Sequence, residues 1–423
     1  MYFLGIDFGT SGARSCVIDM GGAILVEDAR DFGTLQEYER AGIWREALWD
    51  LAASLPPPIR TQLSDIAVDG TSGTVVACDE NLLPRHPPLL YNDDRAVDEA
   101  ALIAKTAVPC HPAAAVTSGL AKTLWLKKRL GLTGARLYLN QADWLSGLLT
   151  GRVGMTDYHN ALKMGLDLDA LKWPAWVEYL ADVDYLPVPM PPGARLAPVS
   201  RPRARYLGIN PHCMVHAGTT DSIAAFLAAG VTQSGDAVTS LGSTLALKLL
   251  SDTLVESTEH GVYSHWFGNR WLAGGASNAG GAVLRQFFDD RQLAALSEKI
   301  NPAIASLLDY VPLPRPGERF PVNDPALLPR LTPRPADDAE FLHGLLESLA
   351  RIEARGYSLL AELGASPLRR VETAGGGARN ITWTQIRQRL LGVPVTRAAH
   401  TEAAYGAALL ARDGERLFDP VQP

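Results

Sequence analysis

The chain has 423 residues, of which 47% are hydrophobic and 20% charged, a composition typical of a globular protein with room for two domains. The formal net charge of −7 and the lack of a Lys/Arg block argue against nucleic acid or an anionic membrane as a partner. The four cysteines form no C-x-x-C pair and no apolar run is long enough to span a membrane, so we expect a cytoplasmic protein with reduced thiols and no signal peptide.

Strand-like and helix-like segments alternate along the chain, which indicates an α/β fold. Apolar runs that predict strands occur at residues 2–6, 66–68, 74–77 and 214–216. A proline-rich stretch at 186–193 precedes the last of these strands, and we place a domain boundary between residues 216 and 217. A second proline-rich stretch, 311–335, is expected to be an ordered surface excursion of the second domain.

One pattern occurs once in each half of the chain. Residues 5–19 and 238–250 both combine a strand, a Gly-Thr/Ser turn and a second strand. Glycine allows the turn to present its N–H groups outward, where they and neighbouring hydroxyls can bind phosphate oxygens. Each turn alone has an ordinary conformational explanation, but the repetition points to a polyphosphate held from two sides. The candidate phosphate-binding residues are Thr10, Ser11, Gly242, Ser243 and Thr244.

Asp7 lies at the end of the first predicted strand, beside the first of these turns. A carboxylate buried in that position needs a partner, and a hydrated Mg²⁺ is one candidate. The alternative is a structural role in which Asp7 accepts hydrogen bonds from the backbone N–H of Gly9 or Thr10.

Asp221 directly precedes the predicted helix 222–229, which Gly230 ends. Asp is a preferred N-cap, so capping alone explains its position. The functional alternative is a general base that accepts the proton of a sugar hydroxyl as the γ-phosphoryl group leaves ATP. Phosphoryl transfer through a loose transition state needs little activation of the nucleophile, so an ionised carboxylate suffices.

Three consecutive glycines, residues 375–377, follow the predicted strand 371–374 and open the predicted helix 381–391, for which Asn380 is a suitable N-cap. The segment matches neither the P-loop nor the dinucleotide-binding glycine pattern. It allows either a ligand close to the main chain, with Gly376, Gly377 and Asn380 in contact, or tight packing of the strand against the helix.

Two further loops carry hydroxyl, carboxylate and guanidinium groups suited to sugar hydroxyls. The first, residues 69–74, contains Ser72, and the second, residues 91–95, contains Asp93 and Arg95. Similar sequences also cap turns in many proteins, so a structural role is the alternative for both.

The ordered set of motifs resembles the FGGY carbohydrate kinases over nearly the whole chain. The motifs are G-I-D-F-G-T-S-G-A-R at 5–14, A-G-T-T-D-S-I-A-A at 217–225, S-L-G-S-T at 240–244, A-G-G-G-A-R-N at 374–380 and E-A-A-Y-G-A-A at 402–408. The resemblance implies two ribonuclease-H-like domains of the actin-like ATPase type around a central cleft. Residues 1–216 would bind sugar, residues 217–423 would bind ATP, and a last helix at about 401–412 would pack on the first domain.

The same resemblance implies roles for particular residues. Asp221 would be the catalytic base, Asp7 would help to hold Mg²⁺ through water, and both are candidate metal ligands. Thr10, Gly242, Ser243 and Thr244 would face the phosphates, and Gly376, Gly377 and Asn380 would lie along the adenosine. Asn278 and Gly281 look similar to a further nucleotide-contacting segment of the family.

The chain departs from the family in its short length and in its Thr71–Thr74 loop, T-S-G-T, which looks most like the branch that acts on D-ribulose. There Asp7, Ser72 and Asp221 would contact the sugar, with D-ribulose 5-phosphate as product, and glycerol is an unlikely acceptor. D-xylulose stays open as an acceptor, as do a non-kinase ATPase and a sugar sensor without turnover. We expect ATP, Mg²⁺ and a small ketose as ligands, and a monomer or homodimer.

Overall fold

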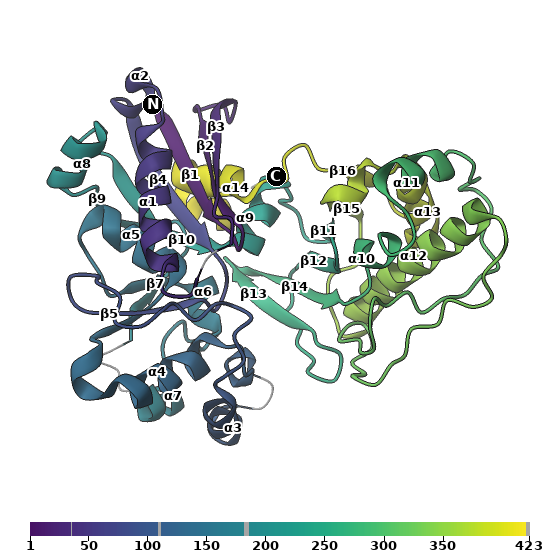
Figure 1. The fold of residues 1–423 in the computed structure, drawn as a ribbon, viewed down its shortest axis with the longest axis horizontal. Helices are drawn as coiled ribbons and strands as arrows, with labels where there is room; N and C mark the ends of the chain where they lie inside the picture. Colours follow the sequence, from purple (N-terminus) through teal and green to yellow (C-terminus); the bar gives the residue numbers. More distant parts are fainter. Residues whose placement is uncertain (35, 109–110, 182–185, 420–423) are drawn as a thin grey trace. The chain divides into compact units, whose positions relative to one another are not determined.

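The computed structural model describes residues 1–34, 36–108, 111–181 and 186–419. The chain divides into two compact units, both of which contain helices and one large mixed sheet (Figure 1). Residues 1–228 and 402–419 form the first unit, and residues 229–401 form the second. The predicted α/β class with two sheet-containing domains is therefore confirmed.

The first unit is built on a six-stranded sheet of order β3-β2-β1-β4-β10-β9. Strands β3, β2 and β1 are antiparallel neighbours, β1, β4 and β10 run parallel, and β9 closes the edge in the antiparallel sense. Its strands are β1 Tyr2–Phe8, β2 Gly12–Ile18, β3 Ile24–Asp31, β4 Leu63–Gly70, β9 Arg195–Pro198 and β10 Met214–Thr220. Six of the seven β1 residues are buried, as expected for a central strand with both faces covered.

Two small sheets and ten α-helices complete the first unit among the described residues. The small sheets pair β5 Val75–Cys78 with β6 Leu137–Asn140, and β7 Met155–Asp157 with β8 Val188–Met190. The α-helices are α1 Arg40–Ala53, α2 Pro57–Arg60, α3 Val97–Thr106, α4 Gly119–Gly134, α5 Gln141–Thr150, α6 Tyr158–Leu162, α7 Ala175–Ala181, α8 Arg201–Leu207, α9 Asp221–Ala228 and α14 Ala403–Asp413. Strand β8 lies inside the proline-rich stretch 186–193, where Pro189 is tolerated because β8 pairs only with the short strand β7.

Helix α14 returns from the end of the chain to pack against β1 and α9 of the first unit, as Figure 1 shows in yellow. The approach requires glycine at two places. A Cβ on Gly5 would lie 2.1 Å from the carbonyl oxygen of Ala404, and one on Gly406 would lie 1.8 Å from that of Ala224. The observed boundary therefore follows Ala228 instead of residue 216, because β10 continues to Thr220 and α9 is held by α14.

The second unit repeats the strand order of the first. Its sheet has the order β13-β14-β12-β11-β15-β16, so β14-β12-β11-β15-β16 corresponds to β3-β2-β1-β4-β10, and β13 is an additional edge strand. The strands are β11 Asp236–Leu241, β12 Leu245–Ser251, β13 Tyr263–Phe267, β14 Arg270–Ser277, β15 Arg370–Ala374 and β16 Val395–Arg397. The repeated strand-turn-strand motif in the sequence is the β1–β2 hairpin in one unit and the β11–β12 hairpin in the other.

The helices of the second unit are α10 Gly281–Leu284, α11 Asp290–Ser297, α12 Asp338–Glu362 and α13 Ile381–Leu391. The proline-rich stretch 311–335 contains no helix or strand, but it is not confined to the surface. Phe320 and Leu313 are buried in the core of this unit, and a Cβ on Gly275 of β14 would meet the Phe320 ring at 2.3 Å.

A buried ion pair joins α12 to α13 in the second unit. Glu353 accepts two hydrogen bonds from Arg387, at 2.6 and 2.7 Å, and a third from the Thr239 hydroxyl at 2.6 Å. Arg387 also donates to the Thr373 hydroxyl at 2.8 Å. Thr239 and Thr373 lie on β11 and β15, so this network fixes the two strands that lead into the glycine-containing turns.

Cys16, Cys78 and Cys213 are buried free thiols, while the fourth cysteine, Cys110, lies outside the described residues. Within the part of the chain that the structure describes, no helix is both long and apolar enough to cross a membrane.

Candidate functional site

Three aspartates gather where neighbouring strands of the first unit end. Asp7 of β1 pairs in register with Asp69 of the parallel strand β4, and Asp69 lies opposite Thr219 of β10. Asp221 directly follows β10 as the first residue of α9, and its charge acts on Asp7. The carboxyl ends of parallel strands are where α/β proteins bind their ligands, so this cluster is the natural centre of a site.

Asp7 and Asp69 are both buried, and burial raises the pKa of both carboxyls. Repulsion by the nearby Asp7 adds to the effect on Asp69, whose pKa lies well above its usual range. For Asp7, the neighbouring Asp69 side chain and the Arg14 guanidinium lower the pKa, but the effect of burial outweighs them. The pKa of both carboxyls is therefore raised, and the larger rise belongs to Asp69.

A purely structural capping role is the alternative for both Asp7 and Asp221, and the contacts of the two side chains differ. The backbone N–H of Gly9 donates to Gly12 at 3.0 Å and not to Asp7, so Asp7 does not cap this turn. Asp221 accepts a hydrogen bond of 2.7 Å from the backbone N–H of Ser222, so it does contact the start of α9. That bond engages one carboxylate oxygen and orients the half-buried side chain at the sheet edge.

The carboxylates of this cluster could hold a magnesium ion that arrives with a nucleotide. Asp7 Oδ1 is buried and has no hydrogen-bond partner among the described residues, and carboxylate oxygens are preferred Mg²⁺ ligands. Within those residues no group of three or more His, Cys, Asp or Glu side chains is arranged to hold a metal by itself. This fits the usual magnesium site, which uses one or two carboxylates and completes its shell with water and phosphate.

The loop after β4 is held in place by Gln141, the first residue of α5. Its side-chain carbonyl accepts hydrogen bonds from the backbone N–H of Thr71 at 3.0 Å and from the Thr71 hydroxyl at 2.9 Å. The Thr71 and Thr74 hydroxyls lie 2.6 Å apart. The hydroxyl of Ser72, between them, has no hydrogen-bond partner within the described chain and is therefore available to a ligand.

Lys122 of α4 fixes the same loop from the other side. Its fully buried Nζ donates to the backbone carbonyls of Gly73 and Thr117, both at 2.8 Å. Burial lowers the pKa of Lys122 to about 7 from an ordinary value of 10.5. The backbone on which Ser72 sits is thus positioned by an amine that titrates near neutral pH.

Replacing Lys122 by methionine is expected to change how stability depends on pH. Between pH 7 and pH 10.5 the amine is protonated in the unfolded chain and largely neutral in the folded one, so this group makes the free energy of unfolding rise with pH. Lys122→Met removes that contribution. The slope of the free energy of unfolding against pH should therefore fall by an amount that corresponds to up to about one bound proton. Denaturant unfolding at a series of pH values measures it, with the exposed Lys105→Met as control; equal slopes in wild type and Lys122→Met would contradict the assignment.

Asp93 and Arg95 form an ion pair with each other. Arg95 Nη2 lies 2.8 Å from Asp93 and 3.4 Å from Glu37. The Arg95 guanidinium also lies over the Trp125 ring at 5.4 Å. Their role as sugar contacts stays a prediction.

A cavity of about 110 Å³ lies beside the β1–β2 hairpin of the first unit. Its lining residues are Gly9, Thr10, Gly33, Arg40, Trp44, Thr71, Leu90 and Tyr91. Thr10 lines this cavity, and Ser11 beside it is exposed at the hairpin tip. This cavity therefore joins the first turn, the loop after β4 and the start of α1.

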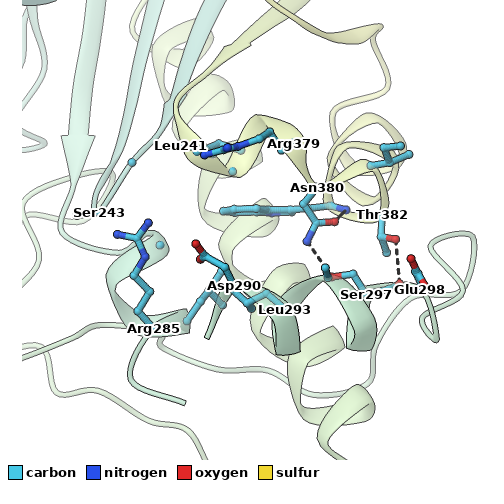
Figure 2. Close-up of a pocket in the computed structure, with 18 residues that line it drawn as sticks. Leu241, Ser243, Arg285, Asp290, Leu293, Ser297, Glu298, Arg379, Asn380 and Thr382 are labelled. Atoms are coloured by element: carbon cyan, nitrogen blue, oxygen red, sulfur yellow. Dashed lines mark hydrogen bonds between the residues drawn. The ribbon is translucent and has the colours of Figure 1, made fainter. Parts of the chain in front are cut away.

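The second unit contains a larger pocket of about 660 Å³, which is within the range of small-molecule sites, about 300–1,000 Å³. It lies between the β11–β12 hairpin, α10–α11 and the glycine turn before α13, as Figure 2 shows. Its lining includes the predicted residues Gly242, Ser243, Gly281, Gly376, Gly377 and Asn380. Thr244 and Asn278 do not line it, and the Asn278 amide donates to the Gly317 carbonyl at 3.0 Å.

Asn380 holds two walls of this pocket together (Figure 2). Its side chain caps α13 by accepting a hydrogen bond from Trp383 N at 3.0 Å and donates to the Ser297 hydroxyl of α11 at 2.8 Å. Thr382 adds a hydrogen bond of 2.9 Å to the Ser297 carbonyl. Asn380 thus has the predicted capping role and also lines the pocket.

At the opposite wall, the hairpin tip is tied to the start of α10. The N–H of Gly281 donates to the Gly242 carbonyl at 2.9 Å, and that of Ala282 donates to the Ser243 carbonyl at 3.1 Å. The hairpin tip and the start of α10, which lie about 40 residues apart in sequence, therefore form one wall of the pocket. Exposed N–H and hydroxyl groups at such a tip suit an anionic ligand.

Several residues of these sites are absent from the sequence-based candidates. Asp69 is included only as part of the candidate loop 69–74; it lies at the end of an apolar strand as Asp7 does, so the argument used for Asp7 could have singled it out. Gln141 and Lys122 act through bonds to a loop about 50 to 70 residues away, and no local pattern signals them. Trp383 lines the pocket from the predicted helix 381–391, and Arg285 lines it from the residue that follows α10.

Comparison with known proteins gives a consistent result. Residues 237–412 match the C-terminal domain of the FGGY family of carbohydrate kinases. The chain is 25% identical to a xylulose kinase of Staphylococcus xylosus, covering 99% of this chain and 92% of that protein. It is 22% identical to a gluconokinase of Bacillus licheniformis, covering 97% and 86%. Among solved structures, a xyloylose kinase from Brucella ovis superposes with a TM-score of 0.87 at 20% identity, covering 99% of this chain and 92% of the other.

Proposed function

Since residues 237–412 match the C-terminal domain of the FGGY family of carbohydrate kinases, we propose that this chain phosphorylates a five-carbon ketose, D-ribulose, on its terminal hydroxyl with ATP as donor. The product would be D-ribulose 5-phosphate. The observation that supports the proposal best is the placement in one unit of Asp221, Asp7 and the unpaired Ser72 hydroxyl, on elements that end at one sheet edge. The T-S-G-T sequence of the Ser72 loop is the feature that favours D-ribulose.

In this proposal Asp221 is the general base. The acceptor hydroxyl attacks the γ-phosphorus while the bond to the leaving ADP breaks, and the hydroxyl proton passes to the Asp221 carboxylate. The hydrogen bond from Ser222 N holds one oxygen of that carboxylate at 2.7 Å and fixes its direction. Because the transition state is loose, orientation and late proton acceptance are sufficient.

Asp7 has a different task. Its buried Oδ1, which has no hydrogen-bond partner among the described residues, would hold Mg²⁺ through water, with Asp221 as a second candidate ligand. The ion supplies positive charge that neutralises the phosphates of the donor. Thr10 and Ser11 of the first hairpin are the candidates for phosphate contacts in this unit.

The nucleotide is assigned to the pocket of the second unit. Gly242 and Ser243 would contact phosphates, and Gly376, Gly377 and Asn380 would lie along the adenosine. A Cβ on Gly377 would lie 2.7 Å from both Leu241 and Trp383, so any larger residue would fill this wall. Thr244 and Asn278 have weaker support, because neither lines the pocket.

D-Xylulose is the second candidate acceptor, because relatives that cover nearly the whole chain are named xylulose kinases. ADP release should be measured with D-ribulose, D-xylulose, D-gluconate and glycerol at equal concentrations, and each product identified by mass and NMR. We expect the highest kcat/KM with D-ribulose. A higher value with D-xylulose would select the second candidate, and activity with D-gluconate alone would reject both.

A further inference from the structure

The cavity of the first unit contains a positive charge that the proposed chemistry does not use. Arg40, the first residue of α1, lines the cavity together with Thr10, Thr71 and Tyr91. These neighbours belong to the phosphate hairpin and to the two loops from which sugar contacts are expected. The cavity therefore adjoins the place assigned to the acceptor.

Arg40 has no ionic partner within the described residues, and its guanidinium makes no hydrogen bond there. The two nearest acidic residues in sequence are otherwise engaged: Glu37 pairs with Arg95 at 3.4 Å, and Glu39 accepts a hydrogen bond from Gln36 N at 3.1 Å. Arg40 is also half-buried, and removing a charge from water without a partner costs free energy. The five N–H donors of the guanidinium therefore indicate a hydrogen-bond acceptor that comes from a ligand.

The size of the cavity limits what that partner can be. A volume of 110 Å³ is less than the roughly 150 Å³ of a cavity that holds benzene, so it can take one end of a small sugar but no nucleotide. Trp44 and Leu90 provide apolar walls, while Thr10 and Thr71 provide hydroxyls. Such a lining suits a short carbon chain with several oxygens.

We propose that Arg40 is a specificity-determining residue that binds the oxygen atoms at the end of the acceptor remote from the phosphorylated hydroxyl. This inference rests on the proposed function and adds the residue that recognises the other end of the sugar. A guanidinium can donate two parallel hydrogen bonds, which match an adjacent carbonyl and hydroxyl of a ketose. They match the carboxylate of a sugar acid better still, since that group is charged.

The test compares Arg40→Gln with wild type in steady-state kinetics. We expect KM for the ketopentose to rise on the order of 10- to 100-fold, the usual loss for a hydrogen bond to a charged group, with kcat and the KM for ATP nearly unchanged. Arg40→Lys should recover part of this loss, because it keeps the charge but lacks the planar fork. Arg45→Gln, on the same helix but outside the cavity, is the matched control and should behave as wild type.

Binding of a five-carbon aldonate as a competitive inhibitor gives a second readout. Its inhibition constant should rise in Arg40→Gln by a larger factor than KM for the ketose, because a full charge pair is lost. An unchanged KM in Arg40→Gln, an equal rise in the KM for ATP, or a lowered Tm without rescue by lysine would overturn the inference. If wild type phosphorylates another sugar and no ketopentose, the proposed function fails, and the same Arg40 comparison is made with that sugar.

Discussion

Replacing Asp221 by alanine is expected to lower kcat by about 10²–10⁴-fold, the usual contribution of a positioned acid or base. The variant should keep its fold and its affinity for ATP, since Asp221 is only half-buried at the first position of α9 and the nucleotide pocket lies in the other unit. Loss of the contact to Ser222 N should cost no more than about 0.5–2 kcal/mol of stability.

Kinetics of Asp221→Ala and Asp221→Asn beside wild type would measure this effect. The exposed Asp98→Asn on α3 of the same unit is the control for a lost carboxylate and should retain full activity. A kcat within a few-fold of wild type in both Asp221 variants would remove Asp221 from its assigned role. Unchanged nucleotide affinity, measured by calorimetry, together with an unchanged Tm, would exclude a folding defect.

Replacing Glu353 by glutamine is expected to destabilise the second unit by about 3–5 kcal/mol. Arg387 is fully buried and would lose the carboxylate that accepts two of its hydrogen bonds, leaving an uncompensated charge in the core. Thr239 on β11 would lose its carboxylate acceptor at the same time. The effect is large because a buried charge without a partner cannot be hydrated.

A matched control exists on the same helix. Glu362, also on α12, pairs with Arg355, but both side chains are more than half exposed. Surface pairs contribute about 0–1 kcal/mol, so Glu362→Gln should be nearly neutral. Urea unfolding followed by tryptophan fluorescence would measure both, and equal effects of Glu353→Gln and Glu362→Gln would contradict the importance of the buried network.

The parts of the fold that depend on local signals follow from the sequence. The two strand-turn-strand motifs became the β1–β2 and β11–β12 hairpins, and Asn380 caps α13 as its position suggested. The FGGY resemblance was confirmed by the family match, and the α/β class by the superposed structure. Each of these features depends on a few neighbouring residues or on the order of short motifs along the chain.

Features created by long-range pairing were harder to predict. Asp69 lies beside Asp7 because two strands about 60 residues apart in sequence pair in that register. Lys122 and Arg40 contact or adjoin loops that are distant in sequence, and only the fold brings these loops next to them. The first unit extends to Ala228 and not to residue 216, because α14 from the end of the chain packs on α9. No local sequence pattern predicts this contact.

The central claim is that this chain moves the γ-phosphoryl group of ATP onto a ketopentose. Incubation with [γ-³²P]ATP, Mg²⁺ and D-ribulose, followed by separation of the labelled products, tests it most directly. The account predicts labelled pentulose phosphate in equal amounts to ADP, and little turnover without sugar. Label released as inorganic phosphate at the same rate with and without the ketopentose would contradict it.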